Sequence, residues 1–259
     1  MIGRRLLDSA SVIADGAVRV LLAPSCAVCR AQLTRPLDGP VCSACWSAVR
    51  PLTPPLCELC GDALASWRGA APRCPRCRRR PPAFTVARSA GCYEGSLREI
   101  VHAFKYSRRR AIAGPLCSLM RGSGHDVLIG ADAVVPVPLH RWRAWTRGFN
   151  QADDLARALG PPVWRLLRRA RAGPPQASLP ASRRHANVRG AFAIAGRYDS
   201  FEIWPGPGRR ARGSVLVLID DVMTTGATLD ACARTLLAAG AREVRVLTAA
   251  RAVARQPAR

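Results

Sequence analysis

The sequence predicts an α/β fold, a mostly parallel sheet flanked by helices, with a small metal-binding module before it. Two observations carry this prediction. From residue 83 onward, short and uniformly apolar segments alternate with helical patterns, as in parallel strands that are covered on both faces. Between residues 26 and 77, cysteines occur as four Cys-x2-Cys pairs, a spacing typical of zinc ribbons. The length of 259 residues fits one large or two modest domains.

Residues 1–23 predict an amphipathic helix. Asp8, Asp15 and Arg19 interrupt the apolar stretch at residues 6–23, whereas a membrane-spanning helix needs about 20 nearly uncharged residues. The cysteines begin directly after this stretch, which is unlike a signal peptide. We therefore expect a cytoplasmic protein without a transmembrane segment. Its N-terminal helix packs onto the body of the protein or, alternatively, contacts the surface of the inner membrane.

The eight paired cysteines of residues 24–80 form the first candidate site. Each Cys-x2-Cys turn presents two thiolates on one side of a tight loop, and two such turns complete a tetrahedral shell that suits zinc. Few residues of this segment can build a core, so the metal would supply much of the folding energy. Cysteines could instead form disulfides, hold an iron–sulfur cluster or carry out redox chemistry. Disulfides would need an oxidising compartment, and no secretion signal is visible.

The simplest assignment is a double zinc ribbon with two sequential four-cysteine sites, although a cross-braced pairing also satisfies the spacing. The expected ligands are, in the first site, Cys26, Cys29, Cys42 and Cys45 and, in the second, Cys57, Cys60, Cys74 and Cys77. Three cysteines lie outside this pattern, namely Cys92, Cys117 and Cys232. We expect these three to be small apolar residues of the core.

The second domain comprises residues 83–259, and its elements follow in chain order. The expected strands span residues 85–93, 133–137, 163–167, 215–219 and 244–248. The expected helices span residues 96–106, 111–120, 151–159 and 229–239, where apolar side chains recur at helical spacing. Gly160-Pro161-Pro162 and Gly240 end two of these helices.

The strand at 215–219 leads into the segment that carries the most chemistry. Asp220 and Asp221 follow the strand directly, and the hydroxyl-rich run 224–228 opens the next helix. Ligands of parallel α/β sheets bind beyond the carboxyl ends of the strands. Backbone N–H groups and threonine hydroxyls of this run would form a phosphate nest, in which Gly226 permits a positive φ. Carboxylates beside such a nest predict a ribose 5-phosphate site; the alternative is an acidic turn with a threonine cap.

The segment LIDDVMTTGAT resembles the phosphoribosyl pyrophosphate (PRPP) motif of type I phosphoribosyltransferases. The chain as a whole resembles the ComF family, in which a double zinc ribbon precedes a phosphoribosyltransferase domain. The other segments that carry this resemblance are HAFKY at 102–106, VPVPLH at 135–140, RGFNQA at 147–152 and NVRGAF at 187–192. The resemblance implies a type I phosphoribosyltransferase-like fold for the second domain.

The resemblance also implies roles for individual residues. Asp220 and Asp221 would hold the ribose hydroxyls of PRPP close to Mg²⁺. The 5-phosphate would lie in a cradle made of Thr224, Thr225, Gly226, Ala227 and Thr228. The turn at 135–139, with Val137, Pro138 and Leu139, takes the place of the pyrophosphate loop. Residues 168–190 would form a mobile hood that excludes water.

Several basic residues are candidates for the pyrophosphate charge, and these are Lys105, Arg147, Arg183, Arg184 and Arg189. The arginines could equally belong to a solvated loop. Arg147 and Asn150 would shape the mouth of the site, or else Phe149 and Asn150 cap and anchor the following helix. The region 196–213 is typical of an inserted surface loop. Trp142 and Trp145 would form either a stacking surface or packing contacts.

Composition narrows the function classes less than the motifs do. A hydrophobic fraction of 49% excludes a wholly disordered chain. The chain has 40 Lys+Arg and a net charge of +23, but Lys105 is its only lysine, a bias typical of GC-rich coding. The charge is therefore weak evidence for a nucleic-acid partner. We expect a phosphoribosyltransferase of unknown acceptor linked to competence and DNA uptake. The alternative is a non-catalytic protein that binds single-stranded DNA, or an adaptor for the DNA-uptake machinery.

Overall fold

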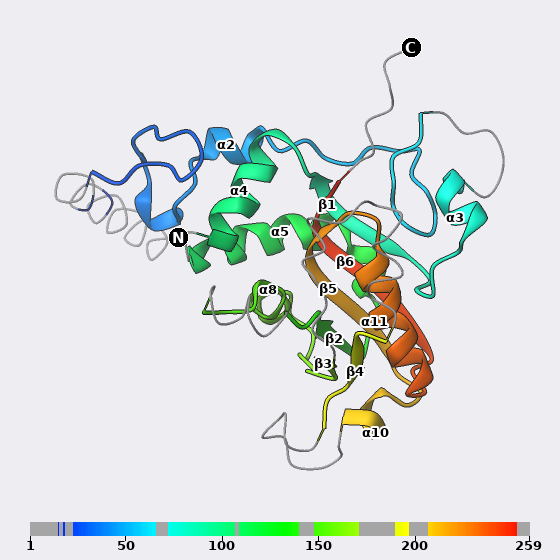
Figure 1. Ribbon diagram of the computed structural model, residues 1–259. Helices are drawn as coiled ribbons and strands as arrows, with labels where there is room; N and C mark the ends of the chain where they lie inside the picture. Colours follow the sequence, from blue (N-terminus) through cyan, green and yellow to red (C-terminus); the bar gives the residue numbers. More distant parts are fainter. Residues whose placement is uncertain are drawn as a thin grey trace, which may run out of the picture.

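The computed structural model describes residues 15, 18, 23–65, 72–106, 109–139, 148–170, 190–196 and 207–252 (Figure 1). Asp15 and Val18 are helical, and the remainder of the expected N-terminal helix lies outside the described residues. Asp15 accepts a hydrogen bond of 3.0 Å from the backbone N–H of Leu37, so this point of the helix is joined to the first ribbon. Within the described part of the chain, no helix is long and apolar enough to cross a membrane.

A parallel sheet of four strands in the order β1-β6-β5-β2 forms the centre of the second domain. The strands are β1 (Ala87–Cys92), β2 (Ala133–Pro136), β5 (Val215–Met223) and β6 (Glu243–Arg251). The parallel sheet is thus confirmed, and β5 and β6 run beyond the expected bounds. β5 continues through Asp220 and Asp221 because its register with β6 is kept as far as Met223 and Arg251.

Helices cover both faces of the sheet (Figure 1). On one face lie α4 (Gly95–Tyr106), α5 (Ala113–Ser123) and α8 (Gln151–Ala158), with the short η2 (Arg110–Ile112) and α6 (His125–Leu128). On the other face lies α11 (Ala227–Ala238). Leu216 and Leu218 of β5 pack toward α11, and Val217 and Ile219 pack toward the opposite helices, as strand alternation requires.

Two expectations for the second domain need correction. The segment 163–167 is not a strand of the main sheet: Val163 makes a single parallel bridge with Val134, and β3 (Leu167–Arg169) pairs antiparallel with β4 (Phe192–Ile194). The region 196–213 is not only a surface loop. It ends in the helix α10 (Pro207–Ala211), whose Ala211 is fully buried in the core. Residues 197–206 lie outside the described part of the chain.

The ribbon module packs against the second domain and covers one edge of its sheet. Its short helices are η1 (Pro36–Asp38), α2 (Ser43–Ser47) and α3 (Pro75–Arg79). β1 is an edge strand, and its N–H groups at Ala87 and Cys92 donate to the carbonyl oxygens of Leu59 (2.8 Å) and Arg50 (2.9 Å). The ribbons therefore satisfy backbone donors that an open sheet edge would leave to solvent or to another chain.

The cysteines outside the ribbons follow the expectation in two cases of three. Cys117 and Cys232 are fully buried core residues, whereas Cys92 is only partly buried. Burial raises the pKa of the Cys117 thiol to about 12.

Candidate functional site

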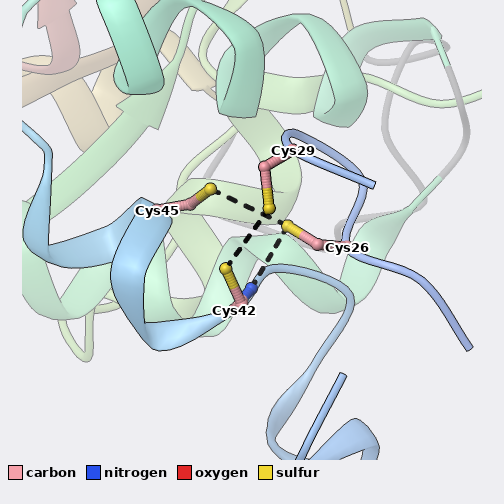
Figure 2. A group of neighbouring side chains, drawn as sticks. All are labelled: Cys26, Cys29, Cys42 and Cys45. Carbon is pink, nitrogen blue, oxygen red and sulfur yellow. Dashed lines mark hydrogen bonds between the residues drawn. The ribbon is translucent and has the colours of Figure 1, made fainter. Parts of the chain in front are cut away.

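The first four-cysteine cluster is formed by two turns of the first ribbon. In Figure 2 the side chains of Cys26, Cys29, Cys42 and Cys45 point toward one another. The Sγ atoms of Cys26 and Cys45 are 3.9 Å apart, and those of Cys29 and Cys42 are 3.7 Å apart. Backbone N–H groups of Val28 and Cys42 donate to Cys26 Sγ at 3.4 Å. Although burial raises the pKa of Cys26, these and neighbouring N–H groups lower it overall to about 6.

The second cluster is enclosed by the protein. Cys57, Cys60, Cys74 and Cys77 are all buried, and the Sγ atoms of Cys60 and Cys74 are 3.7 Å apart. Cys57 Sγ accepts a hydrogen bond of 3.3 Å from the N–H of Cys74. Hydrogen bonds from the neighbouring thiols of Cys60 and Cys77 hold the pKa of Cys57 well below its usual range, so this cysteine is poised to be a thiolate.

Both clusters fit zinc. In each, the four sulfur atoms lie within 4.8 Å of one another. A tetrahedral zinc–thiolate centre with bonds of about 2.3 Å places its sulfur atoms about 3.8 Å apart, close to the measured separations. The pairing is sequential, and the cross-braced pairing is excluded. The clusters differ in access, because Cys29 of the first is exposed and the second has no exposed member.

The candidate ribose site lies where β5 ends. Asp220 and Asp221 are adjacent in the strand, so their side chains leave opposite faces of the sheet. The fully buried thiol of Cys232 on α11 has a pKa raised first by burial and then by the charge of Asp220, which places Asp220 on the α11 face. Asp221 is on the other face, where it pairs with Lys105 of α4. Asp220 Oδ1 also accepts from the N–H of Asp221 at 2.8 Å.

The pairing of Lys105 with Asp221 joins the only lysine of the chain to this acidic strand end. Lys105 Nζ lies 2.9 Å from Asp221 Oδ1, and the two side chains are only 14% and 12% exposed. Lys105 Nζ also lies 6.0 Å from the centre of the Tyr93 ring. The ammonium group neutralises one of two neighbouring carboxylates, so the strand end carries less negative charge than its sequence indicates.

The loop that follows β5 contains a left-handed residue directly before a helix. Gly226 has φ +79°, in the left-handed region that favours glycine, and it directly precedes α11. Thr224 is exposed, and Thr225 and Thr228 are partly exposed. Thr225 Oγ1 accepts a long hydrogen bond of 3.4 Å from the N–H of Ala227, but the N-cap residue of α11 is Gly226 and provides no side-chain cap. The same helix end presents its N–H groups to an anion.

The turn after β2 lies at the same edge of the sheet. β2 runs parallel to β5, with Pro136 paired to Ile219, and the N–H of Val137 donates to the carbonyl of Ile219 at 3.0 Å. Asn150 Nδ2 donates to the carbonyl of Val137 at 3.2 Å. Val137 is buried, whereas Pro138 and Leu139 are partly exposed. The structure therefore brings the expected pyrophosphate turn next to the acidic strand end.

The remaining expected site residues divide into two groups. Asn150 caps α8, because its Oδ1 accepts from the N–H of Ala152 at 3.2 Å, and Phe149 packs edge-on against Phe104 at 5.9 Å. Asn150 therefore caps the helix α8, and Phe149 anchors its start against α4. The antiparallel strands β3 and β4 flank the segment expected to form the hood, and residues 171–189 of that segment lie outside the described residues. Also outside them are Trp142, Trp145, Arg147, Arg183, Arg184 and Arg189.

Sequence reasoning missed the residues that join the second ribbon to this site. Asp62 forms an ion pair with Arg76 of the same ribbon and a second one with Arg251, across the domain boundary. Arg76 Nη1 also donates to the carbonyl of Thr224 at 3.4 Å. Of these residues, only Arg76 could have been singled out from the local sequence, because it lies inside a Cys-x2-Cys turn.

Fold and site together define a phosphoribosyltransferase-type domain preceded by a double zinc ribbon. The family model of the double zinc ribbon domain matches residues 17–79, and that of the phosphoribosyl transferase domain matches residues 146–259. The ribbon match and the two cysteine clusters support Zn²⁺ sites.

Relatives over most of the chain identify the family. Competence protein F of Haemophilus influenzae is 30% identical over 88% of this chain and 96% of its own length. DNA utilization protein YhgH of Escherichia coli K12 is 33% identical over 85% of this chain and 94% of its own length. Competence protein ComFC of Bacillus subtilis is 30% identical over 59% of this chain and 58% of its own length. The chain belongs to the ComF family.

Among solved structures, the allosteric regulatory enzyme of purine biosynthesis is similar, with 20% identity and a TM-score of 0.36. The match covers 57% of this chain and 30% of the other.

Proposed function

We propose that this protein binds Mg²⁺-PRPP, or a related ribose 5-phosphate ligand, at the carboxyl end of β5. One observation carries the proposal. At a single sheet edge, the acidic end of β5 passes through a left-handed Gly226 into the N-terminus of α11, beside the turn after β2. Carboxylates for hydroxyl groups and helical N–H groups for a phosphate are thereby adjacent, as a ribose 5-phosphate group requires.

The proposed residue roles are those that the family resemblance implies. Asp220 and Asp221 accept hydrogen bonds from the ribose hydroxyls, and residues 224–228 hold the 5-phosphate. Lys105 lowers the negative charge that an approaching polyanion meets, since it pairs with Asp221 at 2.9 Å. The turn with Val137, Pro138 and Leu139 is the proposed pyrophosphate loop. Further candidates for the pyrophosphate charge, from the family resemblance alone and outside the described residues, are Arg147, Arg183, Arg184 and Arg189. A closed hood would exclude water from the ribosyl centre.

Magnesium fits this site as a companion of the ligand. Mg²⁺ prefers oxygen ligands and is commonly bound by one or two carboxylates together with substrate phosphates. Two carboxylates lie at the end of β5. Among the described residues, the groups of side chains suited to hold a resident metal ion are the two cysteine clusters. When bound, Mg²⁺ would supply charge neutralisation for the leaving pyrophosphate. The protein groups orient the ribose and hold its 5-phosphate, and an acceptor nucleophile of unassigned identity receives the ribosyl group.

Titration calorimetry tests the binding proposal. Mg²⁺-PRPP and ribose 5-phosphate should both bind the zinc-loaded wild type, and Asp220→Asn should weaken Mg²⁺-PRPP by at least about tenfold, since a charge-assisted hydrogen bond is lost. The matched control is Asp126→Asn, which removes a carboxylate from α6. The side chain of Asp126 is 55% exposed. Absence of binding by both ligands to the wild type would overturn the proposal. Release of pyrophosphate from labelled PRPP, assayed with a panel of bases and amines, decides between an enzyme and a PRPP-binding protein.

A second candidate function is binding of single-stranded DNA, with or without an adaptor role in DNA uptake. The relatives' names refer to competence and DNA utilisation. On this chain, a run of arginines follows the second ribbon at 78–80, and Arg78, Arg79 and Arg80 are all exposed. Exposed arginines contact phosphates, so affinity should fall steeply with salt. In an anisotropy assay, Arg78→Ala with Arg79→Ala should lower both the affinity and the salt slope. Trp142→Ala with Trp145→Ala tests base stacking. Weak binding unaffected by either pair of changes would exclude this function.

A further inference from the structure

Arg76 belongs to the second ribbon but contacts residues 224–228 of the other domain, which we call the phosphate loop. It lies in α3, between Cys74 and Cys77. Its Nη2 donates to Asp62 Oδ2 at 2.8 Å, and its Nη1 donates to the carbonyl oxygen of Thr224 at 3.4 Å. The guanidinium therefore connects a turn of the second ribbon with the first residue of the loop 224–228.

A second arginine ties the same aspartate to the metal cluster. Arg251, at the end of β6, has no exposed surface, and its Nη2 lies 3.3 Å from Asp62 Oδ2. The same nitrogen donates to Cys60 Sγ at 3.5 Å. Arg251 is also paired in register with Met223, the residue before Thr224. Contacts thus run without a break from a cysteine of the cluster, through two arginines and an aspartate, to the phosphate loop.

The charges in this chain of contacts favour a negatively charged metal cluster beside Arg251. A buried guanidinium is costly unless negative charge surrounds it. Asp62 is shared between two arginines, so one carboxylate serves two cations. A zinc ion with four thiolates carries a net charge of about −2, which supplies the remaining negative charge. The second ribbon and the phosphate loop are therefore built as one electrostatic unit.

The contact with Thr224 has a specific consequence for a phosphate nest. Such a nest binds an anion only when its N–H groups face the ligand and its carbonyl oxygens point away. Arg76 holds the Thr224 carbonyl on the ribbon side of the loop. A loop whose carbonyl is already held loses less conformational freedom when it binds.

We propose that Arg76 is a positioning residue through which the second zinc ribbon sets the conformation of the phosphate loop. Given the proposed function, the ligand held by this loop is the 5-phosphate of a ribose. The ribbon is in this way part of the ligand site, and it strengthens phosphate binding without contacting the phosphate.

Calorimetry with two probes distinguishes positioning of the loop from a direct contact with pyrophosphate. In the zinc-loaded protein, Arg76→Gln should weaken ribose 5-phosphate and Mg²⁺-PRPP by the same factor, about 3- to 10-fold, as expected for one hydrogen bond. A direct contact with pyrophosphate would weaken Mg²⁺-PRPP alone and would overturn the proposal. Arg73→Gln is the matched control, since Arg73 is in the same ribbon and pairs with the partly exposed Glu58. It should leave both affinities unchanged.

Hydrogen exchange measures the loop itself, without a ligand. Amides of residues 224–228 should exchange faster in Arg76→Gln than in the wild type or Arg73→Gln, while zinc content stays at two per chain. Arg76→Lys should restore only part of the protection, because a single ammonium group cannot reproduce a forked guanidinium. Asp62→Asn combined with Arg76→Gln should reduce the exchange protection of the loop by less than the sum of the two single changes.

The failure of this proposal is separable from that of the proposed function. Wild-type protein that binds neither probe refutes the proposed function, and the exchange measurement still decides the role of Arg76. Wild-type binding with unchanged affinity and exchange in Arg76→Gln refutes the positioning role alone.

Discussion

The ion pair between Lys105 and Asp221 makes a quantitative test of how the site is held together. Lys105→Met removes the ammonium group but keeps a long apolar side chain. The carboxylate of Asp221 is then left with 12% of its side chain exposed and without its cation. A buried charge that loses its partner is the costly case in ion-pair energetics.

The separation of the two charges sets the size of the expected loss of stability. Opposite unit charges 2.9 Å apart attract by about 6 kcal/mol at an effective dielectric constant of about 20. Desolvation of both groups offsets much of this attraction, and removal of one partner from a buried pair typically costs about 3–5 kcal/mol. Because both side chains keep some contact with solvent, we expect a cost of about 3 kcal/mol, at the lower end of that range. This corresponds to a fall of roughly 6–12 °C in the melting temperature.

Urea and thermal unfolding of zinc-loaded protein measure this loss. Lys105→Met with Asp221→Asn removes both charges, so the double variant should be more stable than Lys105→Met alone, with a coupling energy of about 2 kcal/mol. Arg35→Met is the control, because Arg35 pairs with Asp38 on the surface, where the side chains are 66% and 61% exposed. It should change stability by less than about 1 kcal/mol.

Two results would show that this ion pair does not stabilise the protein. One is a Lys105→Met variant as stable as the Arg35→Met control. The other is additivity of the two single changes in the double variant, which would mean that Lys105 and Asp221 do not interact energetically.

Three further predictions concern the metal sites and the core. A chelator should remove zinc in two steps of about one ion each, the first from the cluster with the exposed Cys29; release in a single step, followed with a chromogenic indicator, would contradict this. Gly61→Ala should destabilise the protein by about 1–3 kcal/mol in urea, because Gly61 has φ +64° and an added Cβ would lie 2.6 Å from a backbone oxygen of β1. Gly122→Ala in α5, with nothing within 4 Å, should not be destabilising. Burial raises the pKa of Cys117 from 9.0 to about 12, so the stability it contributes is present below pH 9 and lost as the pH rises toward 12. Relative to Cys117→Ala, the wild type should lose about 1.4 kcal/mol per pH unit over this range in reducing buffer, and a difference independent of pH would exclude the effect.

The parts of the structure with a short-range pattern could be predicted from the sequence. The zinc ligands were predicted because a Cys-x2-Cys turn places two thiolates together by local geometry alone. The strand at the centre of the sheet was predicted from its apolar run, but its end was not. β5 continues to Met223, past two aspartates, because pairing with β6 depends on backbone hydrogen bonds and not on side-chain polarity.

The parts that depend on distant partners could not be predicted. β3 begins at Leu167 because it pairs with β4, a partner that the local sequence does not reveal. Arg251 and Asp62 are 189 positions apart, and their contact becomes visible only when the ribbon is placed against β6. The ion pair of Lys105 with Asp221 belongs to the same class, because it joins a helix of one motif with the strand end of another.

We propose that the loop between β5 and α11 holds a ribose 5-phosphate group. A crystal structure of the zinc-loaded protein with Mg²⁺-PRPP would show whether it does. We expect the 5-phosphate within hydrogen-bond distance of the backbone N–H groups of residues 224–228, with ribose hydroxyls at Asp220 or Asp221. Density for PRPP at another place, such as the exposed arginines 78–80, with the loop left empty, would contradict it.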